Sequence, residues 1–90
     1  MPIELSELKR ESQRALVDFL WCEVKLANTF HEIAKGTHDP RHRAKLLEDV
    51  RKAVSTIRHF EVRITDPAGR KALNAEADKL DALLSGDKGR

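Results

Sequence analysis

An apolar row in the first third of the chain places the strongest limit on how this sequence can fold. Its members recur at alternating steps of three and four residues, which predicts one long α-helix with a continuous apolar face. The row comprises Leu5, Leu8, Ala15, Phe19, Cys22, Leu26 and Ile33, with Ser12 and Thr29 completing the series. A second row runs alongside it and broadens the predicted face: Leu16, Leu20, Ala27, Phe30 and Ala34.

The predicted helix is long compared with the rest of the chain. It covers about 32 residues, or roughly 48 Å at the rise of an α-helix. The two later helical segments are shorter, so within one chain they can cover only part of this face. We therefore expect part of the apolar row to contact a partner from outside the chain.

Composition favours a small soluble helical domain. The chain has 90 residues, of which 40% are hydrophobic and 36% charged, near the size at which a single core is only marginally sufficient. The periodic apolar residues distinguish it from a disordered chain. A net charge of +2 is too small for a general attraction to nucleic acid or an anionic membrane, so we expect neither as a partner.

Two Asp-Pro pairs mark the breaks in the helical periodicity. Asp39-Pro40 and Asp66-Pro67 each provide an N-cap followed by proline at the first helical position. Gly36 follows the first helix at the position where a left-handed residue often ends a helix. We predict one domain over residues 1–84, with helices at about 3–35, 40–64 and 67–84 and a flexible tail at 85–90.

The links between the predicted helices determine the topology. The first link is short enough to force the first two helices into an antiparallel hairpin. At Thr65-Asp66 the chain either reverses again or continues with a kink, and the separate N-cap favours reversal. The predicted fold is all-α, an antiparallel bundle of three helices with a long hairpin and a shorter third helix, which we expect to form a dimeric bundle.

The predicted core lies between the first two helices. We expect Phe19 and Leu26 to be nearly fully buried against Val54 and Ile57, so truncating any of them should cost about 2–5 kcal/mol. Cys22 belongs to the same row and is predicted to be a small buried hydrophobe. A single cysteine excludes an internal disulfide framework and fits a reducing compartment.

Two carboxylates interrupt the apolar faces. The hairpin is expected to bring Glu23 near Arg51 and Glu61 near Arg14. Metal centres in helical bundles need a Glu-x-x-His motif on a helix, which this sequence lacks. We therefore predict structural ion pairs at the edge of the core.

Histidines and basic residues surround the first link. His31, His38 and His42 are weak candidates for a metal site, because a tetrahedral site needs a further ligand and Asp39 is engaged as a cap. We predict no metal and no cofactor there. The free N–H groups at the start of the second helix also favour an anion. The basic residues that could hold one are Lys35, Arg41, Arg43 and Lys45.

A second apolar patch lies on another side of the first helix. Between Ala15 and Ala27 this helix is apolar nearly all round, which is typical of a helix buried on several sides. Either the third helix covers the patch within one chain or a second subunit covers it. Because tryptophan is a preferred interface anchor, we predict a subunit interface at Val17, Trp21 and Val24. Leu5 and Leu8 of the first row extend past the end of the second helix in the hairpin, and we predict that they belong to the same interface.

The sequence lacks the motifs of common enzymes. It has no nucleophilic triad pattern, no phosphate-binding glycine loop and no Cys/His zinc spacing. We also expect no secretory signal and no membrane span. The resulting prediction is a cytoplasmic, non-enzymatic module for self-association as a homodimer or for contact with a protein partner. The alternative is a small metal- or anion-binding bundle that uses the first link.

Overall fold

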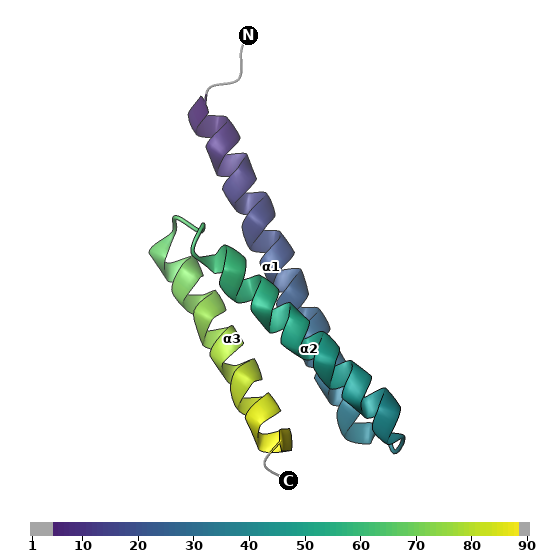
Figure 1. Ribbon diagram of the computed structural model, residues 1–90. Coiled ribbons are helices and arrows are strands. Elements are labelled where there is room, and N and C mark those ends of the chain that lie inside the picture. Colours follow the sequence, from purple (N-terminus) through teal and green to yellow (C-terminus); the bar gives the residue numbers. More distant parts are fainter. Residues whose placement is uncertain (1–4, 89–90) are drawn as a thin grey trace.

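Three helices make up the described part of the chain. The computed structural model describes residues 5–88, and the side chains of residues 7–86. The helices are α1 (Leu5–Gly36), α2 (Pro40–Glu61) and α3 (Pro67–Lys88). Figure 1 shows α1 and α2 as a hairpin, with the chain reversing again so that α3 returns alongside α2. The predicted all-α antiparallel bundle of three helices is confirmed, and the second link is a reversal.

Both Asp-Pro pairs start a helix as predicted. Asp39 is the N-cap of α2, and its Oδ1 accepts the Arg41 backbone N–H at 3.0 Å. Asp66 does the same for α3, where its Oδ2 accepts the Gly69 N–H at 3.1 Å. Each carboxylate therefore satisfies one of the amide groups that a helix start leaves without a partner.

The ends of the helices differ from the prediction. Gly36 has no positive φ, and α1 is instead closed by Thr37, whose hydroxyl donates to the Ile33 carbonyl at 2.7 Å. α2 ends at Glu61 because the next amides bond three residues back, with the Ile64 N–H donating to the Glu61 carbonyl at 3.0 Å. This tight turn points Ile64 into the core, where it is buried.

α3 continues beyond the predicted end at Leu84. It runs to Lys88, and Gly86 keeps a helical backbone without a positive φ. Nothing in the segment from Ser85 onward breaks a helix as a proline would, so α3 continues through residues that we assigned to a flexible tail. Residues 89–90 of that tail lie outside the described residues.

The hydrophobic core lies between all three helices. Its largest fully buried side chains are Leu20 from α1, Val50 and Ile57 from α2, and Leu73 and Leu80 from α3. α1 presents one face to this core, formed by Leu20, Val24, Ala27, His31 and Ala34. The alanines on this face let the packed helices approach closely, because the interaxial distance depends on the side chains at the contact.

The predicted burial is confirmed for α2 and wrong for Phe19 and Leu26 of α1, although Leu20, Ala27 and Ala34 of the second predicted row are buried. Val54 and Ile57 are buried, whereas Phe19 is 46% exposed and Leu26 is 48% exposed. Cys22 is exposed as well, contrary to the prediction. The physical reason is rotation: α1 must face α2 and α3 together, and the face that does so is centred on Leu20 and Val24.

The molecule is elongated because α1 projects beyond the other two helices (Figure 1). Its extents are 58 × 22 × 16 Å and its radius of gyration is 15.9 Å, compared with about 12 Å for a compact chain of this length. From Glu7 to Phe19 no side chain of α1 is buried. The fully buried face of α1 therefore begins at Leu20, and among the described residues before it only the half-buried Leu16 and Val17 pack against the core.

Two polar clusters hold the elements together. The Gln13 carboxamide of α1 donates to the Arg63 carbonyl at 2.9 Å and accepts the Thr65 N–H at 2.9 Å. This bidentate contact fixes the loop between α2 and α3 against α1. The other cluster surrounds Arg58, which donates to Asp78 and Asp81 of α3.

No helix in the described residues has an apolar segment long enough to cross a membrane.

Candidate functional site

The apolar row is exposed along the outer face of α1. Every member from Leu8 to Ile33 lies at the surface. The four large ones are between 45% and 48% exposed: Leu8, Phe19, Leu26 and Ile33. Alternating steps of three and four correspond to the a and d positions of a heptad, the spacing with which one helix packs along another. Leu5 belongs to the row in sequence, but its side chain lies outside those described.

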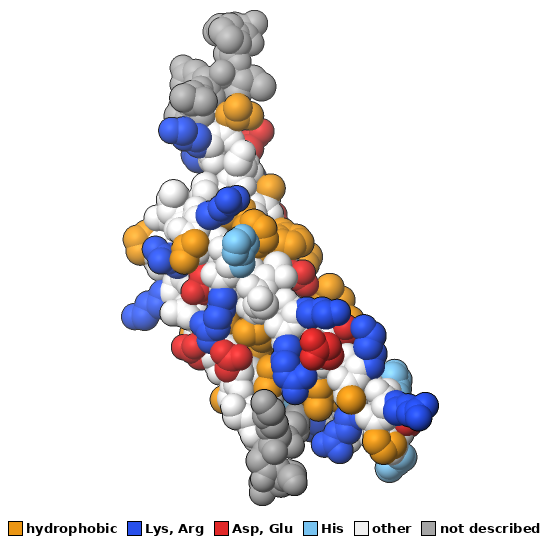
Figure 2. Space-filling view, viewed as in Figure 1, with side chains coloured by type: hydrophobic (Ala, Val, Ile, Leu, Met, Phe, Trp, Pro, Cys, Tyr) orange, Lys and Arg blue, Asp and Glu red, His pale blue; other side chains and the backbone are white. Residues whose placement is uncertain are grey.

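The apolar row and the core-facing side chains occupy different sides of α1. At about 100° per residue, Phe19 and Leu26 fall roughly 80–160° around the helix from Val24 and Ala27. The ring of Phe19 packs edge-on against Phe60 near the end of α2, with 6.3 Å between ring centroids. Figure 2 shows hydrophobic side chains reaching the surface over the middle of α1, bordered by charged ones. α1 thus has two apolar faces, and the chain covers one of them.

Charged side chains border the apolar row on both sides. One flank carries Lys9 and Glu23, and the other carries Glu11, Asp18 and Lys25. The ion pairs found among the described residues use other groups. These five charges are therefore available to a molecule that packs on the apolar row.

The predicted interface patch lies closer to the core than we expected. Val24 is a buried core residue, and Val17 and Trp21 are half-buried against the same core. The prediction that this patch is exposed is therefore wrong for Val24. For this residue the alternative holds, in which the same chain covers the patch. Of the other two predicted interface residues, Leu8 is exposed. The apolar surface that faces outward is thus the apolar row.

The three histidines do not meet. His31 is buried on the core face of α1, whereas His38 and His42 are exposed. Among the described residues, no group of three His, Cys, Asp or Glu side chains is arranged to hold a metal ion. The separation follows from α1, which turns the imidazole of His31 inward and away from the link.

The basic residues at the same end of the molecule are exposed and partly paired. Lys35 bonds Glu32 at 3.2 Å and Lys45 bonds Asp49 at 3.1 Å. Arg41 and Arg43 are exposed. Because Asp39 already accepts an amide at the start of α2, part of the anion-binding capacity of this helix start is in use.

The two predicted ion pairs at the core edge are wrong. Arg51 pairs with Glu48 on its own helix at 3.0 Å, and not with Glu23. Glu61 has a buried Oε2 without a hydrogen-bond partner, although we expected Arg14 to pair with it. Both errors follow from the rotation of α1, since the predicted neighbours assumed that the apolar row faced α2.

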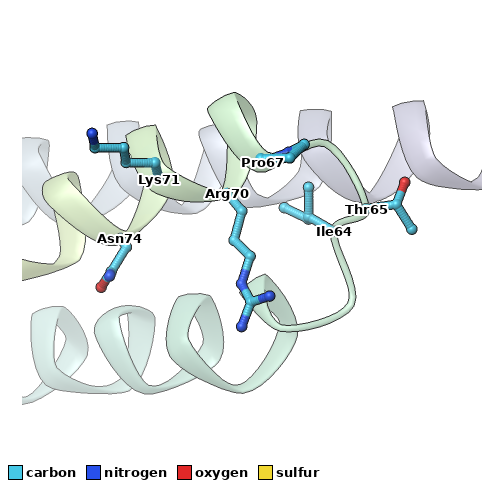
Figure 3. A pocket seen from close by; sticks show the side chains of 6 residues that line it. All are labelled: Ile64, Thr65, Pro67, Arg70, Lys71 and Asn74. Atoms are coloured by element: carbon cyan, nitrogen blue, oxygen red, sulfur yellow. The ribbon is translucent and has the colours of Figure 1, made fainter.

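The hollows of the described surface are shallow and open. Figure 3 shows one of about 320 Å³ beside the start of α3, lined by Ile64, Thr65, Pro67, Arg70, Lys71 and Asn74. Arg70 extends toward the end of α2, whereas Lys71 points away from it. The Asn74 amide oxygen already accepts from Arg58 at 3.2 Å. This arrangement offers flexible cations at an open surface but no paired acid and base.

A larger hollow of about 670 Å³ lies where the projecting part of α1 leaves the loop between α2 and α3. The Gln13 carboxamide is one of its polar lining groups, and it is hydrogen-bonded to the Arg63 carbonyl and the Thr65 N–H. Lys9 and Ser12 also line it, so it adjoins the apolar row.

Comparisons with protein-family models, curated proteins and solved structures found no match to this chain.

Proposed function

We propose that this chain is a non-enzymatic self-association module whose contact surface is the apolar row of α1. The observation that carries the proposal is a heptad row, completed by Ser12 and Thr29, with four large, half-exposed apolar side chains on a face other than the one that packs in the core. Large contiguous exposed apolar patches on soluble proteins mark interaction sites. The heptad spacing indicates that the contacting element is another helix.

The shape of the molecule supports the same proposal. The first part of α1 projects from the bundle and has no buried side chain between Glu7 and Phe19. Isolated helices shorter than about 12–15 residues are marginally stable in water, so a second helix alongside would stabilise this segment. Two-fold pairing of like surfaces is the commonest assembly. Two hairpins joined in this way would form a four-helix core, with α3 of each copy packed outside it.

The link between α1 and α2, where His38 and His42 lie, offers less support for a binding site. Its histidines are separated and two of its basic residues are engaged in ion pairs. These features do not favour the alternative of a metal- or anion-binding bundle.

Sedimentation equilibrium at micromolar concentration tests the proposal. We expect the wild-type chain to have twice the 10.2 kDa mass of one chain. Leu26→Glu should give a single chain that keeps its helical circular dichroism, because Leu26 is 48% exposed and contributes little to the intrachain core. The matched control is Leu83→Glu on α3, a leucine that is 42% exposed and lies off the apolar row.

The control variant should keep the dimer mass. A wild-type mass of 10.2 kDa that does not change with concentration would contradict the proposal. Equal dissociation by Leu26→Glu and Leu83→Glu would also contradict it, because the contact would then not depend on the apolar row.

A further inference from the structure

We propose that two copies of this chain pair antiparallel along the apolar row, in the register that places Ala15 of one copy opposite Phe19 of the other. The inference rests on the proposed self-association and adds its orientation and register. Three features of α1 carry it: the sizes of the side chains in the apolar row, the charges on its flanks, and the projection of the helix from its own bundle.

The side-chain sizes fit an antiparallel pair. In such a pair each a position faces a d position of the other helix. The proposed register sets Ala15 opposite Phe19, Ser12 opposite Cys22, and Leu8 opposite Leu26, each occurring twice by symmetry. The Ala15–Phe19 layer thus pairs a small residue with the largest one, whereas Ser12–Cys22 joins two small residues and Leu8–Leu26 joins two large ones. A parallel pair would place Phe19 against its own copy and Ala15 against its own copy, so a crowded layer would adjoin an underfilled one.

The flanking charges favour the same register. In an antiparallel pair each flank meets the same flank of the other copy. The register brings Lys9 opposite Glu23 on one flank and Glu11 opposite Lys25 on the other, each pair occurring twice. Asp18 meets its own copy, and Glu32 of the same flank falls opposite position 4, which lies outside the described residues. Within one chain these four paired charges make no ion pair among the described residues, so no existing contact has to break.

The flanking charges of the other arrangements are less complementary. In a parallel pair the flanks cross, and Asp18 of each copy meets Glu23 of the other. In the adjacent antiparallel register, Phe19 would face Cys22, and the gain of Asp18 opposite Lys25 would be offset by Glu11 opposite Glu32. Flanking charges of this kind select orientation and register, whereas the apolar layers provide the affinity.

The projection of α1 gives the pairing a further consequence. The first part of α1, which carries Leu8 and has no buried side chain from Glu7 to Phe19, would lie along the second part of α1 in the other copy. That second part is held in place by its own core through Val24 and Ala27. Each projecting segment would therefore pack on a rigid helix. In a parallel pair the two projecting segments would have only each other.

Disulfide trapping distinguishes the orientations, because Cys22 is exposed and lies in the apolar row. In the proposed register, Ser12→Cys should form a covalent dimer through Cys22 of the other copy under mild oxidation, with the Cα atoms within the roughly 4.4–6.8 Å that a disulfide spans. The wild-type chain should not cross-link, because its two Cys22 residues would lie about 15 Å apart along the axis. The double variant Ser12→Cys/Cys22→Ser is the matched control and should also remain uncross-linked.

Charge exchange gives a second measurement that does not depend on cysteine. Lys25→Glu should raise the dimer dissociation constant by roughly tenfold, since it replaces two attractive pairs with two repulsive ones. Glu11→Lys/Lys25→Glu should restore the wild-type value, because the same pairs form with their charges exchanged. Neither residue faces a charge in the parallel arrangement, where Glu11 meets Leu16 and Lys25 meets Phe30.

The outcomes separate this inference from the proposed function. Sedimentation equilibrium of the reduced proteins reports whether they dimerise at all, and a single-chain mass would overturn both proposals. A dimer that cross-links through wild-type Cys22, or in which the double charge exchange does not restore affinity, would overturn the orientation and leave self-association standing. Cross-linking confined to Ser12→Cys, together with restored affinity, would establish the register.

Discussion

Arg58 shows how much one side chain contributes to the placement of α3. Its guanidinium donates to Asn74 at 3.2 Å, to Asp78 at 2.8 Å and to Asp81 at 2.5 Å. The hydrogen bonds with Asp78 and then Asp81 raise the pKa of Arg58 above the ordinary arginine value. A raised pKa in the folded state means that the stabilisation is complete below that ordinary value and is lost only at higher pH. Measurements near neutral pH therefore record its full effect.

Removing the contacts of Arg58 with α3 should destabilise the folded chain only modestly. Arg58→Ala should lower the free energy of unfolding by about 1 kcal/mol, because the cluster is surface-exposed and screened by solvent. The control is Arg51→Ala on the same helix, which loses only a local pair with Glu48 and should cost about 0.3–0.5 kcal/mol. Urea denaturation at low and high salt measures both. Equal losses in the two variants would mean that the Arg58 cluster adds nothing beyond a local pair.

At the scale of the element, α1 is unusual because it is apolar on two faces. Leu20 and Phe19 are neighbours in sequence, yet Leu20 is fully buried and Phe19 is half-exposed. The buried face determines the fold of the single chain, and the apolar row is the surface that we propose for assembly. Substitutions one residue apart should therefore affect two different equilibria.

A pair of truncations tests this division. In a Leu26→Glu background, which we expect to be a single chain, Leu20→Ala should lower the free energy of unfolding by about 2–5 kcal/mol. Phe19→Ala in the same background should cost roughly 1 kcal/mol, since only part of its ring is covered. Thermal or urea denaturation by circular dichroism measures both. If Phe19→Ala cost as much as Leu20→Ala, the assignment of the two faces would be reversed.

The same element shows what could be predicted from the sequence. The three helices followed from periodicity, and the starts of α2 and α3 followed from Asp-Pro pairs, because both signals are local. The rotation of α1 was not predictable in this way. Apolar residues repeat at steps of three and four on both faces of α1. Which face packs in the core depends on how α2 and α3 together cover α1. The error then moved the expected neighbours of Glu23 and Glu61.

The exposed site was therefore predicted only in part. The sequence indicated correctly that α1 carries more apolar surface than the chain can cover, and Leu8 was named. The patch at Trp21 was chosen over the apolar row because the row was assigned to the core. The contacts of Gln13 and Arg58 had no sequence signal, because each joins residues that only the tertiary fold brings together.

At the scale of the whole molecule, shape and assembly are linked. A chain of 90 residues with a radius of gyration of 15.9 Å places much of its surface along one long axis. Two such rods that pair side by side lengthen little and roughly double in width. In the antiparallel register, the links between α1 and α2 of the two copies lie at opposite ends of this assembly.

The distance between those links gives the last prediction. His38 is exposed in the link, so His38→Cys in a Cys22→Ser background accepts a spin label with little effect on packing. Because the two labels lie at opposite ends of the paired helices, pulsed electron–electron double resonance should give a distance of about 60 Å between them. A parallel pair would bring the labels within roughly 20 Å, since packed helices lie about 8–10 Å apart. Adding Leu26→Glu to the labelled chain should remove the defined distance, which ties the measurement to the apolar row; a short distance would instead show that the row pairs in the parallel orientation.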